Sequence, residues 1–113
     1  GMDLYMASNY YQYGEYYSFM KKYENAENYY NKALTTCKSM YDICEEAFSN
    51  YLAKVYLSYA KLMVKVHQKS SAEKFCKEAI ELYTKLEAKE PIVYGDELTD
   101  AYDTFVRIRT MKN

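Results

Sequence analysis

The sequence predicts an all-α fold of about five helices, and three observations support this prediction. Apolar residues recur every three or four positions through most of the chain, which is the spacing of one face of an α-helix. The 113 residues include only 3 Gly and 1 Pro, too few breakers for a fold made of many tight turns. One pattern of residues also returns later in the chain at a fixed interval, which is typical of helical repeats. We expect a single domain over residues 1–113.

The first three helices are predicted from three apolar stripes. These stripes run from Leu4 to Met20, from Tyr23 to Cys37 and from Phe48 to Val64. Asp42 and Glu45 have the spacing of a capping box, so we expect the third helix to start beside them. The predicted bounds are about residues 3–20, 24–39 and 43–67.

The last two helices are separated by the only proline. A fourth apolar stripe runs from Ala72 to Leu86, and the serine pair at 70–71 is expected to cap its helix. Pro91 disfavours a helical conformation at the residue before it, so we expect a break there and a new start at Gly95 and Asp96. The predicted bounds are about residues 71–88 and 95–111.

The charge balance and the cysteines restrict the class of protein. The chain has 15 Lys and Arg against 16 Asp and Glu, and a net charge of −1 argues against a dedicated nucleic-acid binder. The apolar runs are far shorter than the roughly 20 residues of a membrane span, and no secretory signal is visible. An odd count of three cysteines fits free thiols in a reducing compartment. We therefore expect a cytoplasmic protein that binds neither membranes nor nucleic acid.

No set of residues predicts catalysis, a metal site or a cofactor. His67 is the single histidine, no Ser-His-Asp set is found, and the three glycines are isolated rather than part of a phosphate loop. Three scattered cysteines with one histidine do not have the spacing of a zinc site. We expect His67 to end the third helix, where a cation is favourable. The prediction is a protein that is not an enzyme and has no metal or cofactor.

The strongest pattern in the sequence is an internal repeat with a period of 46 residues. The series Tyr10-x-x-Tyr13-Gly14-x-x-Tyr17 returns as Tyr56-x-x-Tyr59-Ala60-x-x-Met63, and then as Tyr102-x-x-Phe105-Val106. In the same register, Ala26, Tyr30 and Ala33 return as Ala72, Cys76 and Ala79. Small residues stay small and large apolar residues stay large, as expected where helices pack. The predicted units are repeat 1 at about 3–40, repeat 2 at about 43–88 and a terminal helix at about 95–111.

This series resembles the tetratricopeptide repeat, in which an aromatic residue, a Gly and a Tyr precede an Ala and a second aromatic residue. Tyr10, Gly14, Tyr17, Ala26 and Tyr30 fit that pattern in order and spacing. The resemblance implies a short right-handed α-solenoid of antiparallel helix hairpins. The family unit has about 34 residues. We interpret the excess here as longer helices beside each inter-repeat turn, similar to the longer-period relatives in kinesin light chains.

The resemblance also implies a concave groove lined by the first helix of each hairpin, which would bind a protein or peptide. Glu15, Asp100 and Asp103 oppose an anion, so we expect a mixed-charge or partly apolar peptide rather than a C-terminal carboxylate. Lys54 and Lys61 would supply a positive patch. The candidate groove residues are Ser8, Tyr11, Gln12, Glu15, Lys54, Leu57, Ser58, Lys61, Asp100, Asp103, Thr104 and Arg107.

Two further interpretations remain open from the sequence. The chain could be a structural part of a longer array or a homo-oligomer, with Val106, Ile108 and Met111 facing a missing helix. Nucleic-acid binding rests only on a small set of basic residues, which are Lys54, Lys61, Lys65, Lys69, Arg107 and Arg109. The tyrosines fall into two sets according to their position relative to the repeat. Those in the repeat register are expected in the core, and those outside it mark either an interface or an ordinary surface; the first set is Tyr10, Tyr13, Tyr17, Tyr30, Tyr56, Tyr59 and Tyr102, and the second is Tyr5, Tyr11, Tyr16, Tyr29, Tyr51 and Tyr94.

Overall fold

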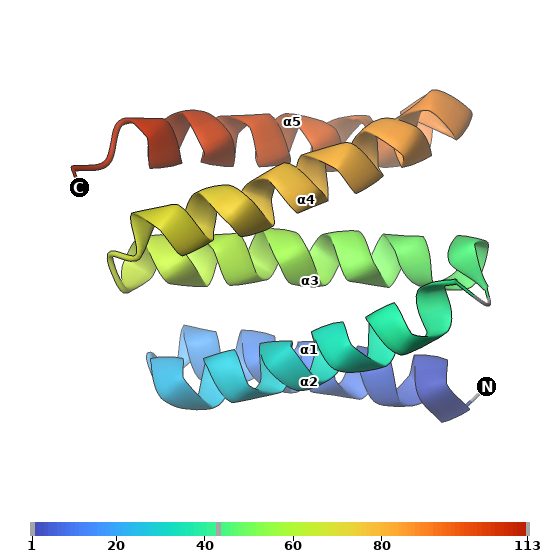
Figure 1. Cartoon of the computed structure of the whole chain (residues 1–113), viewed down its shortest axis with the longest axis horizontal. Helices are drawn as coiled ribbons and strands as arrows, with labels where there is room; N and C mark the ends of the chain where they lie inside the picture. The colour runs from blue at the N-terminus through green and yellow to red at the C-terminus, as the bar shows by residue number, and fades with distance from the viewer. Residues whose placement is uncertain (1, 43, 113) are drawn as a thin grey trace.

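The computed structural model of the chain describes residues 2–42 and 44–112, and these residues form five α-helices (Figure 1). Each helix runs antiparallel to the one before it, so that α1 and α2 form one hairpin, α3 and α4 form a second, and α5 packs on α4. The predicted all-α fold of antiparallel helix hairpins is confirmed. The helices are α1 (Met2–Phe19), α2 (Tyr23–Tyr41), α3 (Glu45–Lys65), α4 (Lys69–Lys89) and α5 (Pro91–Arg109).

The turns inside the two hairpins have the same backbone structure. Lys21 follows α1 with φ of 61°, and His67 follows α3 with φ of 60°, both in the left-handed region. The next N–H in each turn reaches back five residues: Lys22 donates to the carbonyl of Tyr17, and Gln68 to that of Met63, each at 2.8 Å. These bonds define Schellman motifs, which usually have glycine at the left-handed position. His67 therefore lies in the turn beyond α3, not at the end of the helix as predicted.

The observed starts of α3 and α4 lie two residues from the predicted ones, but the predicted side-chain caps are wrong, because neither helix is capped by a side chain. Asp42 is the C-cap residue of α2, and Cys44 precedes α3 without a side-chain hydrogen bond to its first turn. Ile43, which belongs to the predicted capping box, lies outside the described residues. The serine pair at 70–71 lies inside the first turn of α4, which follows Gln68. Tertiary packing therefore fixes these starts, since no local cap does.

The predicted start of α5 is also wrong. Pro91 is the first residue of α5, and Gly95 lies inside the helix. Proline suits this position because its fixed φ is already helical and its missing N–H would have no partner in the first turn. The break expected before Pro91 is confined to Glu90, whose ψ is 76°.

Small side chains lie where the helices approach one another most closely. Six alanines of α2, α3 and α4 have no exposed surface, and large apolar residues fill the layers between them. Among the fully buried side chains, Tyr30 on α2, Tyr83 on α4 and Leu62 on α3 are the largest. A core of this kind depends on close packing, because a larger side chain at an alanine position forces the helix axes apart. These alanines are Ala26, Ala33, Ala53, Ala60, Ala72 and Ala79.

The tyrosines of the repeat register divide according to their neighbours. Tyr30, Tyr56 and Tyr59 are buried, and Tyr10 and Tyr17 are half-buried. Tyr13 and Tyr102 are 53% and 50% exposed, so their prediction as core residues is wrong. Both lie on outer sides of the terminal helices α1 and α5, which no further helix of the described chain covers. Ile108, which was expected to face a missing helix, is instead fully buried, whereas Val106 is exposed.

Candidate functional site

A hollow of about 410 Å³ lies between α1, α3 and α5, and it contains many of the predicted groove residues. The walls combine hydroxyl, aromatic, acidic and basic side chains. The predicted residues that line the hollow are Tyr11, Glu15, Lys54, Leu57, Ser58, Lys61 and Asp100. They come from the first helix of each hairpin and from α5, so the structure brings these three helices to one surface.

The other predicted groove residues do not line this hollow. Gln12 lines a separate shallow depression on α1, where its amide donates to Oγ of Ser8 at 3.4 Å. Asp103 and Arg107 are exposed on α5. Thr104 is fully buried, and its hydroxyl donates to the carbonyl of Asp100 at 2.8 Å. The lining contributed by α5 therefore comes from the turn that contains Asp100.

Hydrogen bonds between helices hold the walls of the hollow together. The hydroxyls of Tyr11 on α1 and Ser58 on α3 lie 3.3 Å apart. Lys61 on α3 forms an ion pair of 2.7 Å with Asp100 on α5. Lys65 donates to Oγ of Ser18 at 3.3 Å. Because Asp100 neutralises Lys61, the positive charge that a ligand would meet comes from Lys54 and Lys65 rather than from Lys54 and Lys61.

The tyrosines around the hollow stay protonated far above neutral pH. Burial raises the pKa of Tyr30, and its hydrogen bond to Glu15, with 2.5 Å between the oxygens, raises the pKa further. Burial is also the main cause of the raised pKa values of Tyr11 and Tyr83. These hydroxyls can therefore donate and accept hydrogen bonds but do not act as bases. The arrangement can hold a ligand by hydrogen bonds, by charge and by apolar contact.

Sequence reasoning missed part of the lining. Lys65 lies one helical turn after Lys61, so an extension of the predicted face along α3 could have found it. Tyr30 and Tyr83 come from the second helices of the hairpins and form the floor, and nothing in their spacing indicated this. The residues that were missed are Ser18, Phe19, Tyr30, Lys65, Tyr83 and Glu97.

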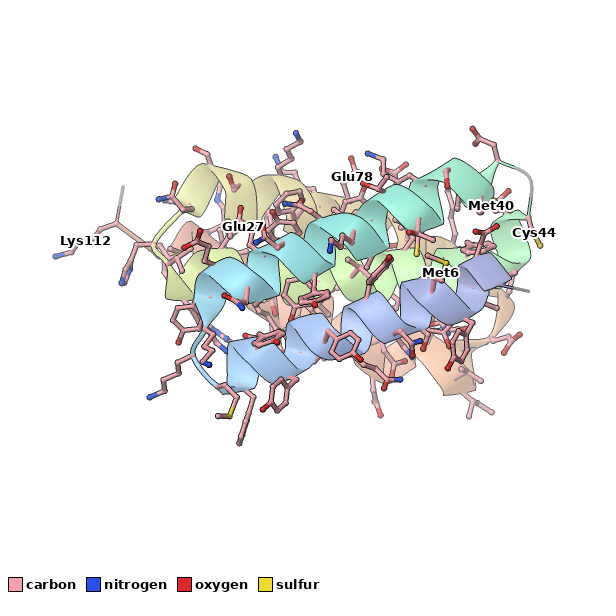
Figure 2. The ribbon with its side chains drawn as sticks, turned by 90° about the horizontal axis from the view of Figure 1, so that it is seen from below. Met6, Glu27, Met40, Cys44, Glu78 and Lys112 are labelled. Carbon is pink, nitrogen blue, oxygen red and sulfur yellow. The ribbon has the colours of Figure 1, made fainter. Side chains whose placement is uncertain are left out.

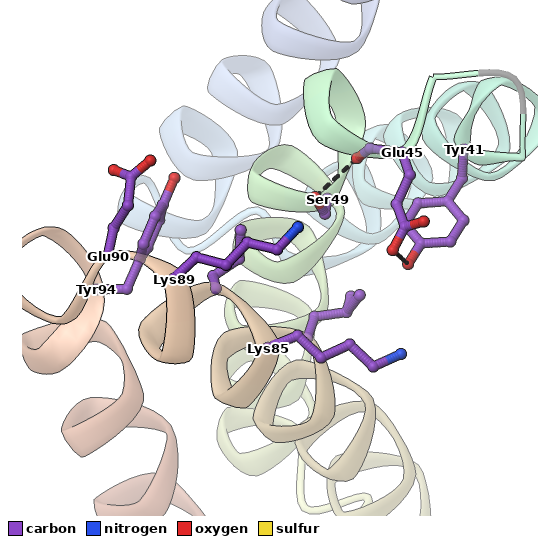
Figure 3. Close-up of a pocket in the computed structure, with 9 residues that line it drawn as sticks. Tyr41, Glu45, Ser49, Lys85, Lys89, Glu90 and Tyr94 are labelled. Atoms are coloured by element: carbon purple, nitrogen blue, oxygen red, sulfur yellow. Dashed lines mark hydrogen bonds between the residues drawn. The ribbon is translucent and has the colours of Figure 1, made fainter.

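A second hollow, of about 250 Å³, lies between the α2–α3 and α4–α5 connections (Figure 3). Its rim carries Lys85, Lys89 and Glu90, all exposed. The hydroxyl of Tyr41 donates to Glu45 at 3.2 Å. None of the predicted groove residues lines this second hollow.

The cysteines are free thiols in two different environments. Cys37 and Cys76 are buried, and Cys44 is exposed at the connection between α2 and α3 (Figure 2). Within residues 2–42 and 44–112, no group of three or more His, Cys, Asp or Glu side chains is placed to hold a metal ion. None of the helices found in those ranges is long and apolar enough to cross a membrane.

Comparison with known proteins bears on the first hairpin. Residues 7–39, which cover most of α1 and α2, match the family model of the tetratricopeptide repeat. Comparison with curated proteins and with solved structures gives no match. The matched segment contains Tyr10, Gly14, Tyr17, Ala26 and Tyr30, the residues on which the resemblance rested. The match thus confirms the resemblance to the tetratricopeptide repeat over the first hairpin.

Proposed function

We propose that this protein is a non-enzymatic interaction module that binds a segment of another protein in the hollow between α1, α3 and α5. The tetratricopeptide repeat supports an interaction module, since members of this family are generally scaffolds without catalysis. Three helices converge on this hollow and bring Tyr11, Ser58 and Asp100 together. This convergence is the observation that supports the hollow as the binding surface. The free thiols support a reducing compartment such as the cytoplasm.

We propose the same repeat division as the sequence suggests, with α1–α2 and α3–α4 as two copies of a 46-residue unit and α5 as the first helix of a third. The matching Schellman turns at Lys21 and His67 support this division, because they are 46 residues apart. The complete burial of Ala26 and Ala72, also 46 residues apart, supports it as well. In this division the hollow is lined by the first helix of each unit.

The side chains of the hollow favour a partner segment that is partly apolar and carries an acidic group. Tyr11 and the exposed Phe19 offer apolar surface along its lining. Lys54 and Lys65 are the cations of the hollow that no described carboxylate pairs. A carboxylate of the partner would gain an ion pair with either lysine, and aromatic or aliphatic side chains would cover Phe19. Complementary charges of this kind set the choice of partner more than the affinity.

Selection of displayed peptides tests this proposal. Peptides are first selected on the wild-type protein, and each enriched sequence is then titrated by calorimetry against two variants. The first variant, Lys54→Glu with Lys65→Glu, reverses charge inside the hollow. The second, Lys38→Glu with Lys77→Glu, makes the same change at exposed positions on α2 and α4 and is the matched control.

The expected result is that the hollow variant loses about tenfold or more in affinity, or about 1.4 kcal/mol, while the control binds like the wild type. Thermal melts of all three proteins check that the fold is intact. Enriched peptides that bind the hollow variant as tightly as the wild type would place the binding surface elsewhere. Loss of binding in the control variant alone would have the same meaning.

A further inference from the structure

One face of α5 is not covered by any other helix of the described chain. Ile92 at the start of the helix is fully exposed, and Tyr102 and Val106 are 50% and 62% exposed. Between them, a Cβ atom added at Gly95 would have nothing within 4 Å. With Thr99, these residues follow one another at spacings of three and four, so they share one side of the helix. We call Ile92, Gly95, Thr99, Tyr102 and Val106 the α5 stripe.

The comparable face of α3 is covered by an antiparallel helix. Tyr56 and Tyr59 stack against Phe75 of α4, with ring centroids 6.1 and 4.2 Å apart. Ala60, on the same side of α3, has no exposed surface. In the repeat register proposed above, Tyr102 and Val106 correspond to Tyr56 and Ala60. The α5 stripe is thus a face that in the preceding hairpin is buried by a helix running the other way.

The charges of α5 indicate which helix can cover the stripe. Asp100 is paired with Lys61, and Arg109 with Glu73, so the charges that α5 can offer outward are the acidic Asp96 in its first half and the basic Arg107 in its last turn. The exception is Asp103, which lies one turn before Arg107. An antiparallel copy of α5 would place the acidic half against the basic end, and a parallel copy would place like charges together.

We propose that a second copy of this chain docks its α5 antiparallel on the α5 stripe, so that a two-fold axis passes between Thr99 and Tyr102. In this register Gly95 lies opposite Val106 of the second copy, and Thr99 lies opposite Tyr102. Each small residue therefore meets a large one, which lets the helices approach closely. Asp96 comes within reach of Arg107 of the second copy. By symmetry each contact occurs twice, as in isologous dimers.

This pairing is separable from the proposed peptide binding. The part of α5 that lines the hollow is contributed by Glu97 and Asp100, and neither belongs to the α5 stripe. A variant that disrupts the dimer is therefore expected to keep the hollow, and a variant of the hollow is expected to keep the dimer.

Light scattering on a size-exclusion column over a wide concentration range gives the first test. The expected result for the wild type is a concentration-dependent dimer, and Val106→Asp is expected to shift it to a monomer with an unchanged helical spectrum. The matched control is Tyr13→Asp, which places the same charge on the exposed side of α1. A wild-type monomer at every concentration would overturn the proposal, as would an association that is abolished by Tyr13→Asp but not by Val106→Asp.

Disulfide trapping tests the direction and register of the pair. In a Cys44→Ser background, which removes the exposed thiol, one sample of chains carries Gly95→Cys and another carries Val106→Cys. Mixed under mild oxidation, they are expected to form a covalent heterodimer, whereas each sample alone is expected to stay largely unlinked. A covalent dimer of Gly95→Cys chains alone would indicate parallel pairing. That result, or the absence of any link in the mixture, would contradict the proposed arrangement.

Discussion

Gly14 on α1 lies against the ring of Tyr30 on α2, so closely that a Cβ atom at Gly14 would be 2.5 Å from Cδ1 and Cε1 of the ring. The ring has little freedom to move away. Tyr30 is 1% exposed, and its hydroxyl is held by Glu15. The absence of a side chain at Gly14 therefore allows the first two helices to pack at this distance.

We predict that Gly14→Ala lowers the free energy of unfolding by about 1–3 kcal/mol through overpacking, although alanine is the better helix former. The control is Gly95→Ala, measured at concentrations where the chain is a monomer, because there the added methyl group meets open space. There we expect a gain of about 0.5–1 kcal/mol from the reduced freedom of the unfolded chain. Denaturant unfolding measures both values. A neutral or stabilising effect of Gly14→Ala would contradict the contact with Tyr30.

Ala26 and Ala72 provide a second test of helix packing. Both have no exposed surface, and each faces another helix. We expect Ala26→Leu and Ala72→Leu each to lower the free energy of unfolding by about 1–3 kcal/mol. Ala88→Leu, at an exposed position of α4, serves as the control and is expected to change stability little. Unchanged thermal melts for both buried substitutions would show that the predicted packing register is wrong.

The two left-handed turn residues predict stabilising substitutions. Lys21→Gly and His67→Gly remove the clash between Cβ and the backbone that any other residue has at φ near 60°. We expect each to raise the free energy of unfolding by about 0.5–1 kcal/mol, net of the greater freedom of glycine in the unfolded chain. Lys22→Gly, at a neighbouring position with φ of −93°, should bring no such gain. Equal effects at positions 21 and 22 would contradict the left-handed assignment.

The buried thiols predict that stability falls at alkaline pH. Burial raises the pKa of Cys37 and Cys76 from the ordinary value of 9.0 to about 11. Because the folded pKa is the higher one, their contribution to stability is fully present below about pH 9 and is lost as the pH rises to about 11. Burial also raises the pKa of Tyr30, Tyr59 and Tyr83, which acts in the same direction at higher pH.

Unfolding free energies measured across this range test the effect. The decline between pH 9 and 11 should become shallower in a Cys37→Ala, Cys76→Ala variant, while the part due to the tyrosines remains. The exposed thiol of Cys44 is the internal reference, because it should react with a thiol reagent in the folded protein well before the other two. A stability that is constant up to pH 11 would contradict the burial of the thiols.

The existence of the five helices was predictable from the sequence, but the start of α5 and the way in which α3 and α4 begin were not. Apolar spacing reports which side of a helix is buried, and it holds along each helix. The starts of α3, α4 and α5 follow Cys44, Gln68 and Glu90, none of which forms a side-chain cap. Local capping rules therefore had no signal to find at these three positions, and the serine pair at 70–71 gave a misleading one.

The sequence pattern also could not predict which side chains are buried in the terminal helices α1 and α5. Tyr13, Tyr59 and Phe105 occupy the same register position, yet Tyr59 is buried and Tyr13 is half exposed. The difference comes from which helices lie beside each residue rather than from the residue itself. Stacking with Phe75 on one side and hydrogen bonds to Glu27 and Asn31 on the other enclose Tyr59.

The candidate site was predictable only for the helices that the family resemblance addresses directly. The resemblance indicated Tyr11, Lys54 and Ser58, which do line the hollow. It gave no sign that Tyr30 and Tyr83 of the second helices reach the same space. Nor did it indicate that Asp100 would neutralise Lys61, since that pair depends on the distance between α3 and α5.

Among the described helices, α3 contacts all four others, whereas contacts elsewhere join consecutive helices only. Local opening can therefore begin at either end of the stack without disturbing the other end: α5 can detach from α4 and α3 while the α1–α2 hairpin stays in place. The amide protons of α3 should then exchange with solvent most slowly, and those of α1 and α5 should exchange first. Exchange of the α3 amides therefore requires about the free energy of unfolding the whole array. The molecule has a rigid centre and two ends that can open independently of each other.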